Sequence, residues 1–325
     1  MKTVATVTAG LLLAGCATAG AAGAQAPRLL SGDHQYFMPF GGRDRAFIVH
    51  RPAGLDTLHP APVILAFHGG GGNGRLQQRF SGLDATADRA GFLVIYPDGT
   101  GRRSDRLLTW NAGTCCGYAA DHQVDDVGFV RALIDRLAAM GRIDRRRVYA
   151  TGMSNGAMMT HRLGAEACDV IAAIAPVAGG MVVPAFHGTR PVPVIEFHSV
   201  DDPRALYHGG LGPPFPFTNS RVMHPDIDSV LAAWVRHDGC PASPRKDEAR
   251  LGAPGTSDSG QTATRLIYAP CRAGAEIVFW RLTGAGHVWP GGHGKTRASI
   301  LGRPTSVVDS NTEIWNFLSR YHLPN

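Results

Sequence analysis

The stretch Val148-Tyr-Ala-Thr-Gly-Met-Ser-Asn-Gly-Ala-Met-Met-Thr-His-Arg-Leu163 decides the fold of this 325-residue chain. A β-prone run, a G-x-S-x-G turn and an amphipathic helical pattern follow one another in it, which is the context of a nucleophile elbow. Glycines flank the serine because the strand and helix backbones approach too closely there to admit a Cβ atom. Ser154 is therefore the candidate nucleophile, exposed on a sharp turn between a strand and a helix.

Composition indicates a globular protein with a large core. Hydrophobic residues make up 44% of the chain and charged residues 18%, which excludes an intrinsically disordered chain. The net charge of +6 comes from scattered arginines without an accompanying nucleic-acid motif. We interpret it as a solvated basic face and expect no nucleic-acid partner.

The first residues predict export. Lys2 precedes an apolar run that is too short to span a bilayer but suits a signal peptide, and Leu13-Ala-Gly-Cys16 resembles the bacterial lipobox. We expect a lipoprotein signal peptide at 1–15, acylation of Cys16, a flexible tether at 16–32 and a catalytic domain at 33–325. The protein would then contact the membrane only through its lipid anchor. The alternative is an ordinary signal, cut near Ala24, that yields a soluble secreted or periplasmic protein.

Apolar runs typical of buried parallel strands lead into candidate catalytic loops. The run 62–67 ends in His68-Gly-Gly-Gly-Gly-Asn73, a turn that leaves backbone N–H groups uncovered for an oxyanion and resembles the HGGG loop of esterases. The run 92–96 leads into a long loop at 100–123, and such loops are usually functional. Asp125-Asp126 next predicts a helix cap better than it predicts a metal or acid pair.

Two later strands are followed by a candidate acid and a candidate base. The run 192–197 continues into Asp201-Asp202, and these two carboxylates compete to orient a histidine. The strand at 275–282 is followed by His287 between glycines, whose neutral imidazole would take the proton of Ser154. The other histidines fit no metal-ligand spacing, so we assign no metal.

Five motifs together resemble the polyhydroxybutyrate depolymerase and feruloyl esterase family of α/β-hydrolases. They are His68-Gly-Gly-Gly-Gly-Asn73, Val124-Asp-Asp-Val-Gly-Phe129, Gly152-Met-Ser-Asn-Gly156, Asp202-Pro203 with Tyr207-His-Gly-Gly210, and Gly286-His-Val-Trp-Pro-Gly291. The resemblance spans roughly residues 33 to 325. It implies an α/β-hydrolase fold, with a mostly parallel central sheet and helices on both faces.

The same resemblance implies roles for individual residues. The nucleophile, base and acid would be Ser154, His287 and Asp202, the oxyanion hole the N–H groups of Gly70 and Asn155, and the substrate-lining rings Trp110 and Trp289.

Cysteines in an exported chain predict disulfides. Cys240 and Cys271 flank one short excursion and match a family pair. Family members often carry cysteine where this chain has Ala165, whereas this chain has Cys168. Because a bond between neighbours is strained, we expect Cys115 or Cys116 to pair with Cys168.

The implied function is a serine esterase that hydrolyses a carboxylic ester through an acyl-enzyme, without a cofactor. The expected substrate is a small-molecule or oligomeric ester, of the feruloyl, acetyl or short hydroxyalkanoate type. The loop 209–217 is the expected movable wall of its site. Depolymerisation of solid polyhydroxybutyrate is an alternative, although no linker or repeat marks a binding module. A non-catalytic, ligand-binding surface lipoprotein is the alternative from another class, and the intact set of serine, aspartate and histidine argues against it.

Overall fold

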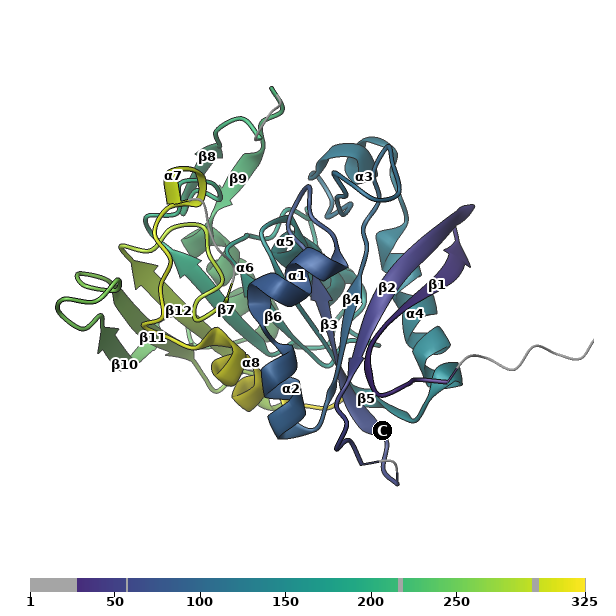
Figure 1. Cartoon of the computed structure of the whole chain (residues 1–325). Coiled ribbons are helices and arrows are strands. Elements are labelled where there is room, and N and C mark those ends of the chain that lie inside the picture. Colours follow the sequence, from purple (N-terminus) through teal and green to yellow (C-terminus); the bar gives the residue numbers. More distant parts are fainter. Residues whose placement is uncertain (1–27, 57, 216–218, 294–297, 325) are drawn as a thin grey trace, which may run out of the picture.

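The computed structural model describes residues 28–56, 58–215, 219–293 and 298–324. Its centre is a ten-stranded sheet in the order β1-β2-β4-β3-β5-β6-β7-β12-β11-β10 (Figure 1). The strands are β1 (Gly32–Phe40), β2 (Arg43–Arg51), β3 (Ala61–Phe67), β4 (Leu93–Pro97), β5 (Ile143–Met153), β6 (Ala173–Val177), β7 (Val194–Ser199), β10 (Arg245–Leu251), β11 (Thr262–Tyr268) and β12 (Ile277–Thr283). Every neighbouring pair from β4 to β12 is parallel, and antiparallel strands complete both ends of the sheet.

Helices cover both faces of this sheet, as Figure 1 shows. One face carries α1 (Gly74–Ser81), α2 (Asp84–Ala90) and α8 (Ser310–Leu318), and the other α4 (Asp126–Met140), α5 (Asn155–Glu166) and α6 (Ile227–Asp238). The remaining elements are the short helices α3 (Gly117–Asp121) and α7 (Ala298–Leu301), a 3-10 turn (Arg272–Gly274), and a two-stranded ribbon of β8 (His208–Leu211) and β9 (Met223–Asp226). This is the α/β-hydrolase fold that the sequence predicted.

Strand β3 shows how sequence produces this layering. All of its residues are buried, and successive side chains enter opposite cores. Val63, Leu65 and Phe67 pack in the core under α4, α5 and α6. Ile64 and Ala66 pack in the core under α2 and α8. An unbroken apolar run is required because a parallel strand is covered on both faces, so the predicted buried strand at 62–67 is confirmed.

The sheet is wider than the apolar runs predicted. Strand β2 is the second strand and not an edge strand, because β1 pairs along its outer side. At the opposite end, β10 is mostly exposed and β11 only partly buried. These added strands have polar sequences because one face or edge meets solvent, and they therefore lack the apolar pattern of buried strands.

Candidate active site

The nucleophile elbow forms where the sequence placed it. Ser154 has a positive φ of 59° between the end of β5 and the start of α5, and its side chain is partly exposed. A Cβ atom on Gly152 would lie 2.6 Å from the carbonyl oxygen of Gly156, and one on Gly156 would collide with the carbonyl oxygen of Phe67. A positive φ is costly for a serine, so this packing holds the turn in a conformation that the residue alone would not choose.

The parallel register brings three loops to one edge of the sheet. Met153 pairs with Val177, Val177 with Phe197 and Phe197 with Trp280, so β5, β6, β7 and β12 end at nearly one level. Ser154 comes directly after β5, whereas Asp202 and His287 lie on longer loops after β7 and β12. The carboxyl ends of parallel strands are where open α/β sheets place their ligands.

His287 and Asp202 form a buried pair. The Nδ1 atom of His287 lies 2.7 Å from Oδ2 of Asp202, and both residues are buried. The other carboxylate oxygen accepts the backbone N–H groups of Arg204 (2.7 Å) and Ala205 (2.9 Å). Burial raises the pKa of Asp202, but the charge and hydrogen bond of His287, with lesser contributions including His198, more than offset it and leave that pKa lowered. Asp202 is therefore held as a carboxylate against the imidazole.

Asp201, the competing carboxylate, turns elsewhere. It is exposed, and its Oδ2 accepts the backbone N–H of Gly284 at 2.6 Å. Adjacent residues on a tight loop point in different directions, so only one of the two can face His287. Here that residue is Asp202.

Two backbone N–H groups lie beside the serine. A Cβ on Gly69 would be 3.4 Å from Cβ of Ser154, and one on Gly70 would be 3.7 Å from Cβ of Asn155, so the glycine loop runs along the elbow. The N–H of Gly70 has no hydrogen-bond partner within the described part of the chain. The N–H of Asn155 is the first of helix α5 and so has no intrahelical acceptor. Both groups are available to an oxyanion.

His68 holds the glycine loop in place from below. Its Nδ1 donates to the carbonyl oxygen of Gly69 (2.8 Å), and its Nε2 accepts the N–H of Gly99 (2.9 Å). Burial lowers the pKa of His68 to about 4, so the ring is neutral and can both donate and accept. His68 was predicted only as part of the HGGG-like motif, without a role of its own, and its place directly before the glycines was the available signal.

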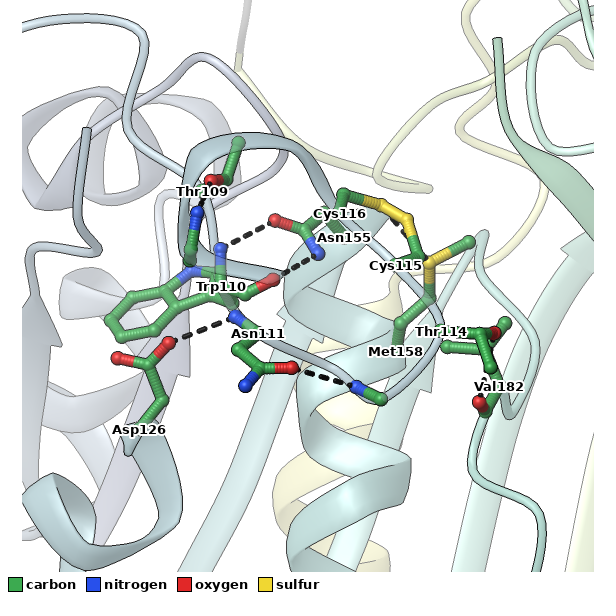
Figure 2. The surroundings of a disulfide bond; sticks show 12 residues. Thr109, Trp110, Asn111, Thr114, Cys115, Cys116, Asp126, Asn155, Met158 and Val182 are labelled. Atoms are coloured by element: carbon green, nitrogen blue, oxygen red, sulfur yellow. Dashed lines mark hydrogen bonds between the residues drawn. A yellow bond between two sulfur atoms is a disulfide. The ribbon is translucent and has the colours of Figure 1, made fainter. Parts of the chain in front are cut away.

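Trp110 holds the same loop and does not line the substrate site. Its ring is 0% exposed, and its indole N–H donates to the carbonyl oxygen of His68 at 3.0 Å. Its backbone N–H and carbonyl bond the side-chain amide of Asn155 at 2.8 and 3.0 Å (Figure 2). The prediction of a substrate-lining ring is wrong for Trp110, because the long loop folds it inward, where it connects the glycine loop to Asn155 of the elbow.

Trp289 is also placed inside the protein. It is 3% exposed, and its indole N–H donates to Oδ1 of Asn311 on α8 at 2.9 Å. This side chain binds the loop of His287 to the last helix, so we withdraw it from the predicted wall of the site. An aromatic ring that does lie beside the glycine loop is Phe215, whose nearest ring atoms would be 3.4 Å from a Cβ built on Gly70 and 3.1 Å from one built on Gly71.

The loop 209–217 is only partly the structure that we expected. Its first residues belong to strand β8, which pairs with β9, and Phe215 follows that ribbon. Phe217 lies outside the described residues. Leu211 and Met223 face one another across the ribbon and are 49% and 63% exposed. The ribbon therefore carries an apolar, solvent-exposed pair next to the segment that covers the glycines.

The disulfide pattern corrects one prediction. Cys115 is bonded to its neighbour Cys116 (Figure 2), and Cys168 is a free, buried thiol. The expected pair with Cys168 is therefore wrong. The 115–116 pair lies on the Trp110 loop, where the N–H of Cys116 donates to the carbonyl oxygen of Trp110 at 3.1 Å.

The second predicted pair is present. Cys240 and Cys271 are joined across a sequence separation of 31 residues. The bond ties the end of α6 to the segment before β12. Cys16 and the predicted signal peptide lie outside the described residues, as does most of the tether.

The adjacent acids Asp125 and Asp126 have separate roles. Asp125 caps α4 by accepting the N–H of Gly128 at 2.8 Å, as predicted. Asp126 is buried and pairs with Arg45 at 2.8 Å, while its other oxygen accepts the N–H of Asn111. Burial raises the pKa of Asp126 and lowers that of Arg45. The pair therefore fixes the loop that carries Trp110.

The described residues contain one group with the composition of a metal site, distant in sequence from the elbow. The possible ligand atoms of Asp33, His50 and Asp84 lie within 4.8 Å of one another. Both nitrogens of His50 already meet carboxylates, Asp33 at 2.6 Å and Asp88 at 3.1 Å. Both ring nitrogens of His50 therefore already have partners. The contacts form a network of hydrogen bonds and ion pairs that joins β1, β2 and α2.

None of the helices in the described ranges has the length and apolar character to cross a membrane.

Comparison with known proteins identifies relatives across most of the chain. The sequence profile described as Esterase PHB depolymerase matches residues 46–262. NocK of Nocardia uniformis subsp. tsuyamanensis, named provisionally as an esterase, is 32% identical over 279 residues, 83% of this chain and 78% of that protein. Feruloyl esterase B of Piromyces equi is 28% identical over 257 residues, 75% of this chain. The match spans 42% of that relative's own length.

Solved structures agree on the fold. The acetyl xylan esterase from Aspergillus awamori has a TM-score of 0.51 and 17% identity, over 78% of this chain and 94% of that one. At that identity the likeness concerns the fold alone.

Proposed function

This chain belongs to the esterase PHB depolymerase family, and we propose that this carboxylic-ester hydrolase acts through Ser154, His287 and Asp202. The carrying observation is the 2.7 Å contact between His287 and Asp202, placed at the same sheet edge as a serine on a nucleophile elbow. The Ser, Asp, His order along the chain is that of α/β-hydrolases.

The proposed mechanism follows from the donors and acceptors. His287 takes the Oγ proton of Ser154 through Nε2 as the oxygen attacks the ester carbonyl. Asp202 orients the ring through Nδ1 and stabilises the imidazolium. The carbonyl oxygen becomes an oxyanion between the N–H groups of Gly70 and Asn155. The proton then goes to the leaving alkoxide, and water, activated by the same imidazole, releases the acyl group.

The experiment that tests this mechanism is active-site labelling. A fluorophosphonate probe should label the wild-type protein and fail to label Ser154→Ala, with circular dichroism as the control for folding. Hydrolysis of a short-chain nitrophenyl ester should be lost in the same variant. Retained hydrolysis without labelling would reject Ser154 as the nucleophile. A folded wild-type protein that is neither labelled nor active would favour the non-catalytic ligand-binding alternative.

For the substrate we propose a soluble feruloyl, acetyl or short hydroxyalkanoate ester. Feruloyl esterase B is a relative, and Phe215 beside the oxyanion loop offers a ring against which a planar acyl group can stack. Polyhydroxybutyrate remains the alternative because of the family to which the chain belongs. Methyl ferulate, a short nitrophenyl ester and a polyhydroxybutyrate film should be compared with one preparation. Clearing of the film ahead of both soluble esters would overturn the preference.

We also propose export with a lipid anchor on Cys16, with residues 1–15 as the signal peptide, 16–32 as the tether and 33–325 as the catalytic domain. The support is the sequence Leu13-Ala-Gly-Cys16 after a short apolar run. Metabolic labelling with palmitate should mark the wild-type protein and not Cys16→Ser. An unlabelled wild-type protein in the culture fluid would support ordinary secretion instead.

A further inference from the structure

Beneath Asp202 lies a group of buried titratable side chains that the proposed mechanism does not use. His161 on α5 and Glu196 and His198 on β7 are 0 to 1% exposed. Their unpartnered atoms, within the described structure, are Nε2 of His161, both carboxyl oxygens of Glu196 and Nδ1 of His198. Buried polar atoms without partners are costly, so a cluster of them calls for an explanation.

The neighbours of the two histidines fix which nitrogen carries the proton. The indole N–H of Trp234, which can only donate, lies 3.0 Å from Nδ1 of His161, so the hydrogen of that ring is on Nε2. Nε2 of His198 lies 2.8 Å from the carbonyl oxygen of Ala205, which can only accept, so that nitrogen also carries a hydrogen. In a neutral His198, Nδ1 is then a lone pair that needs a donor.

Glu196 lies between these complementary atoms. Its Oε2 is 3.9 Å from Nε2 of His161, a donor, and its Oε1 is 3.9 Å from Nδ1 of His198, an acceptor. Both separations exceed hydrogen-bond distance, but a proton on Oε1 would face the His198 lone pair and leave Oε2 to face the His161 N–H. A metal ion held by Nε2 of His161 does not fit, because that nitrogen is already protonated.

Burial and one neighbouring charge favour the protonated form of Glu196. Burial, and then the charge of Asp228, raises the pKa of Glu196 to about 8. Burial also lowers the pKa of His161 to about 3, against a smaller opposing effect of the Gly179 backbone, and lowers that of His198. The hydroxyl of Tyr207 points away to Asp228, at 2.7 Å, so it offers Glu196 no competing bond.

The cluster reaches the proposed triad through His198. Its Nε2 is 3.8 Å from Oδ2 of Asp202, the same oxygen that meets His287. The Ala205 carbonyl that accepts from His198 belongs to the residue whose N–H donates to Oδ1 of Asp202. The proton position on His198 thus fixes the turn that carries Asp202.

We propose that Glu196 is a positioning residue, a buried neutral carboxylic acid that donates to Nδ1 of His198 and so holds the Asp202 turn in place for His287. The inference rests on the proposed function of Ser154, His287 and Asp202. Without this donor, the buried Nδ1 of His198 would lack a partner, so the ring could tilt and its Nε2–H bond to the Ala205 carbonyl would weaken. The turn would then shift and misorient His287.

Glutamine and leucine at position 196 test whether Glu196 acts by donating a hydrogen bond or only by filling space. In Glu196→Gln the amide can donate to His198 and accept from His161, so we expect kcat within about twofold of wild type and an unchanged pH profile of kcat/KM from pH 5 to 9. In Glu196→Leu we expect kcat to fall about 10- to 100-fold with little change in KM. Tyr207→Phe, which alters the same region but not the donor, should behave as wild type.

The ¹⁵N resonances of the histidine rings give a readout besides activity. His198 should show the Nε2–H tautomer in the wild type and in Glu196→Gln. If Glu196→Leu does not fold, these spectra and the Glu196→Gln pH profile decide the matter. A shifted limb in that profile, a doubly protonated His198 in the wild type, or a folded Glu196→Leu with wild-type kcat would each overturn the proposal.

Ser154→Ala, assayed in parallel, distinguishes a failure of the proposed role of Glu196 from a failure of the proposed function. An inactive Ser154→Ala together with a fully active Glu196→Leu rejects only the role of Glu196. An active Ser154→Ala rejects the proposed nucleophile, while the ¹⁵N shift of Nδ1 in His198 still reports whether Glu196 donates to it.

Discussion

The two sides of the candidate site are built differently. The floor, which we define as the glycine loop 68–73, the Trp110 loop and the elbow, is held by buried groups that all have partners: His68, Trp110 and the side chain of Asn155. The outer wall, which we define as residues 208–215 and 219–226, carries the β8–β9 ribbon, in which Leu211 is about half exposed and Met223 more than half. Gly210 on the wall has no atom within 4 Å of a built Cβ, although Gly209 and Gly212 are crowded, whereas Gly156 on the floor has no room for one.

The difference between floor and wall indicates that the floor carries out the reaction and that the wall selects between esters. Stabilising an oxyanion requires donors placed in advance, so the floor must be rigid. Accommodating an acyl or alcohol group requires only an apolar surface, which can vary without loss of the reaction. We therefore expect floor substitutions to reduce kcat for every ester, and wall substitutions to alter the ratio between esters.

The largest effect should come from the serine and the histidine. Ser154→Ala and His287→Ala should each lower kcat about 10³-fold or more without unfolding the protein, because they act as one unit. The double variant should be little worse than either single one. Additive losses in steady-state kinetics would mean that the two residues belong to different machinery.

The next effect tests the acid. Asp202→Asn should lower kcat about 100-fold or more, because the imidazole loses its orientation and the imidazolium its counter-charge. Asp201→Asn is the matched control, since the Asp201 carboxylate accepts the Gly284 backbone N–H and does not face His287, and it should retain most activity. The reverse order of the two rates would reassign the acid.

Acid should destabilise the floor. The pKa of His68 is lowered to about 4, whereas an unfolded histidine titrates near 6.5. The unfolded chain therefore binds a proton first as the pH falls below about 6.5, and stability declines until the pH reaches about 4. At pH 5 this histidine should cost on the order of 2 kcal/mol relative to pH 7. Chemical denaturation at both pH values measures it.

A histidine pair provides the control for that measurement. His68→Asn cannot titrate but can still donate to Gly69, so its stability should depend less steeply on pH. His59 is exposed and lies outside the floor, so His59→Asn is the matched control for the loss of a histidine. Equal pH dependence in all three proteins would show that His68 does not titrate on unfolding.

A smaller effect should follow from the Trp110 bond. Trp110→Phe removes the donor to the His68 carbonyl while keeping most of the ring, and it should lower kcat about 10-fold for acetyl and feruloyl esters alike. A loss confined to one ester would place Trp110 in substrate selection after all. The thermal midpoint of the variant checks that the loop, and not the whole fold, has changed.

The smallest effect should come from the wall. Leu211→Ser and Met223→Ser each remove apolar surface that already meets solvent, so kcat for a short nitrophenyl ester should be nearly unchanged. KM for methyl ferulate should rise about two- to threefold if the ribbon contacts the acyl group. An equal change for both esters, or none for either, would limit selection to the region around Phe215.

The sequence determined the elements that depend on neighbours along the chain. The elbow was predictable because its glycines, serine, strand and helix are contiguous, and β3 because burial on both faces demands an unbroken apolar run. The α4 cap was predictable for the same reason, since Asp125 bonds an N–H three residues away. The Ser, Asp, His order, together with the strands before each residue, placed the three candidates at one edge of the sheet.

Tertiary structure decided everything that depends on where a loop goes after its strand ends. Asp201 and Asp202 are chemically identical in sequence, and only the turn at 202–205 points one of them to His287. Trp110 was expected to line the substrate site but is buried, and Cys168 has no disulfide partner within the described residues because Cys115 and Cys116 bond to each other. The donors and acceptors around Glu196 come from α5, β7 and the 202–205 turn, so no local pattern marks them. Local spacing encodes turns and periodicity, whereas these contacts join atoms far apart in the chain, whose meeting is settled only when the sheet and its helices pack.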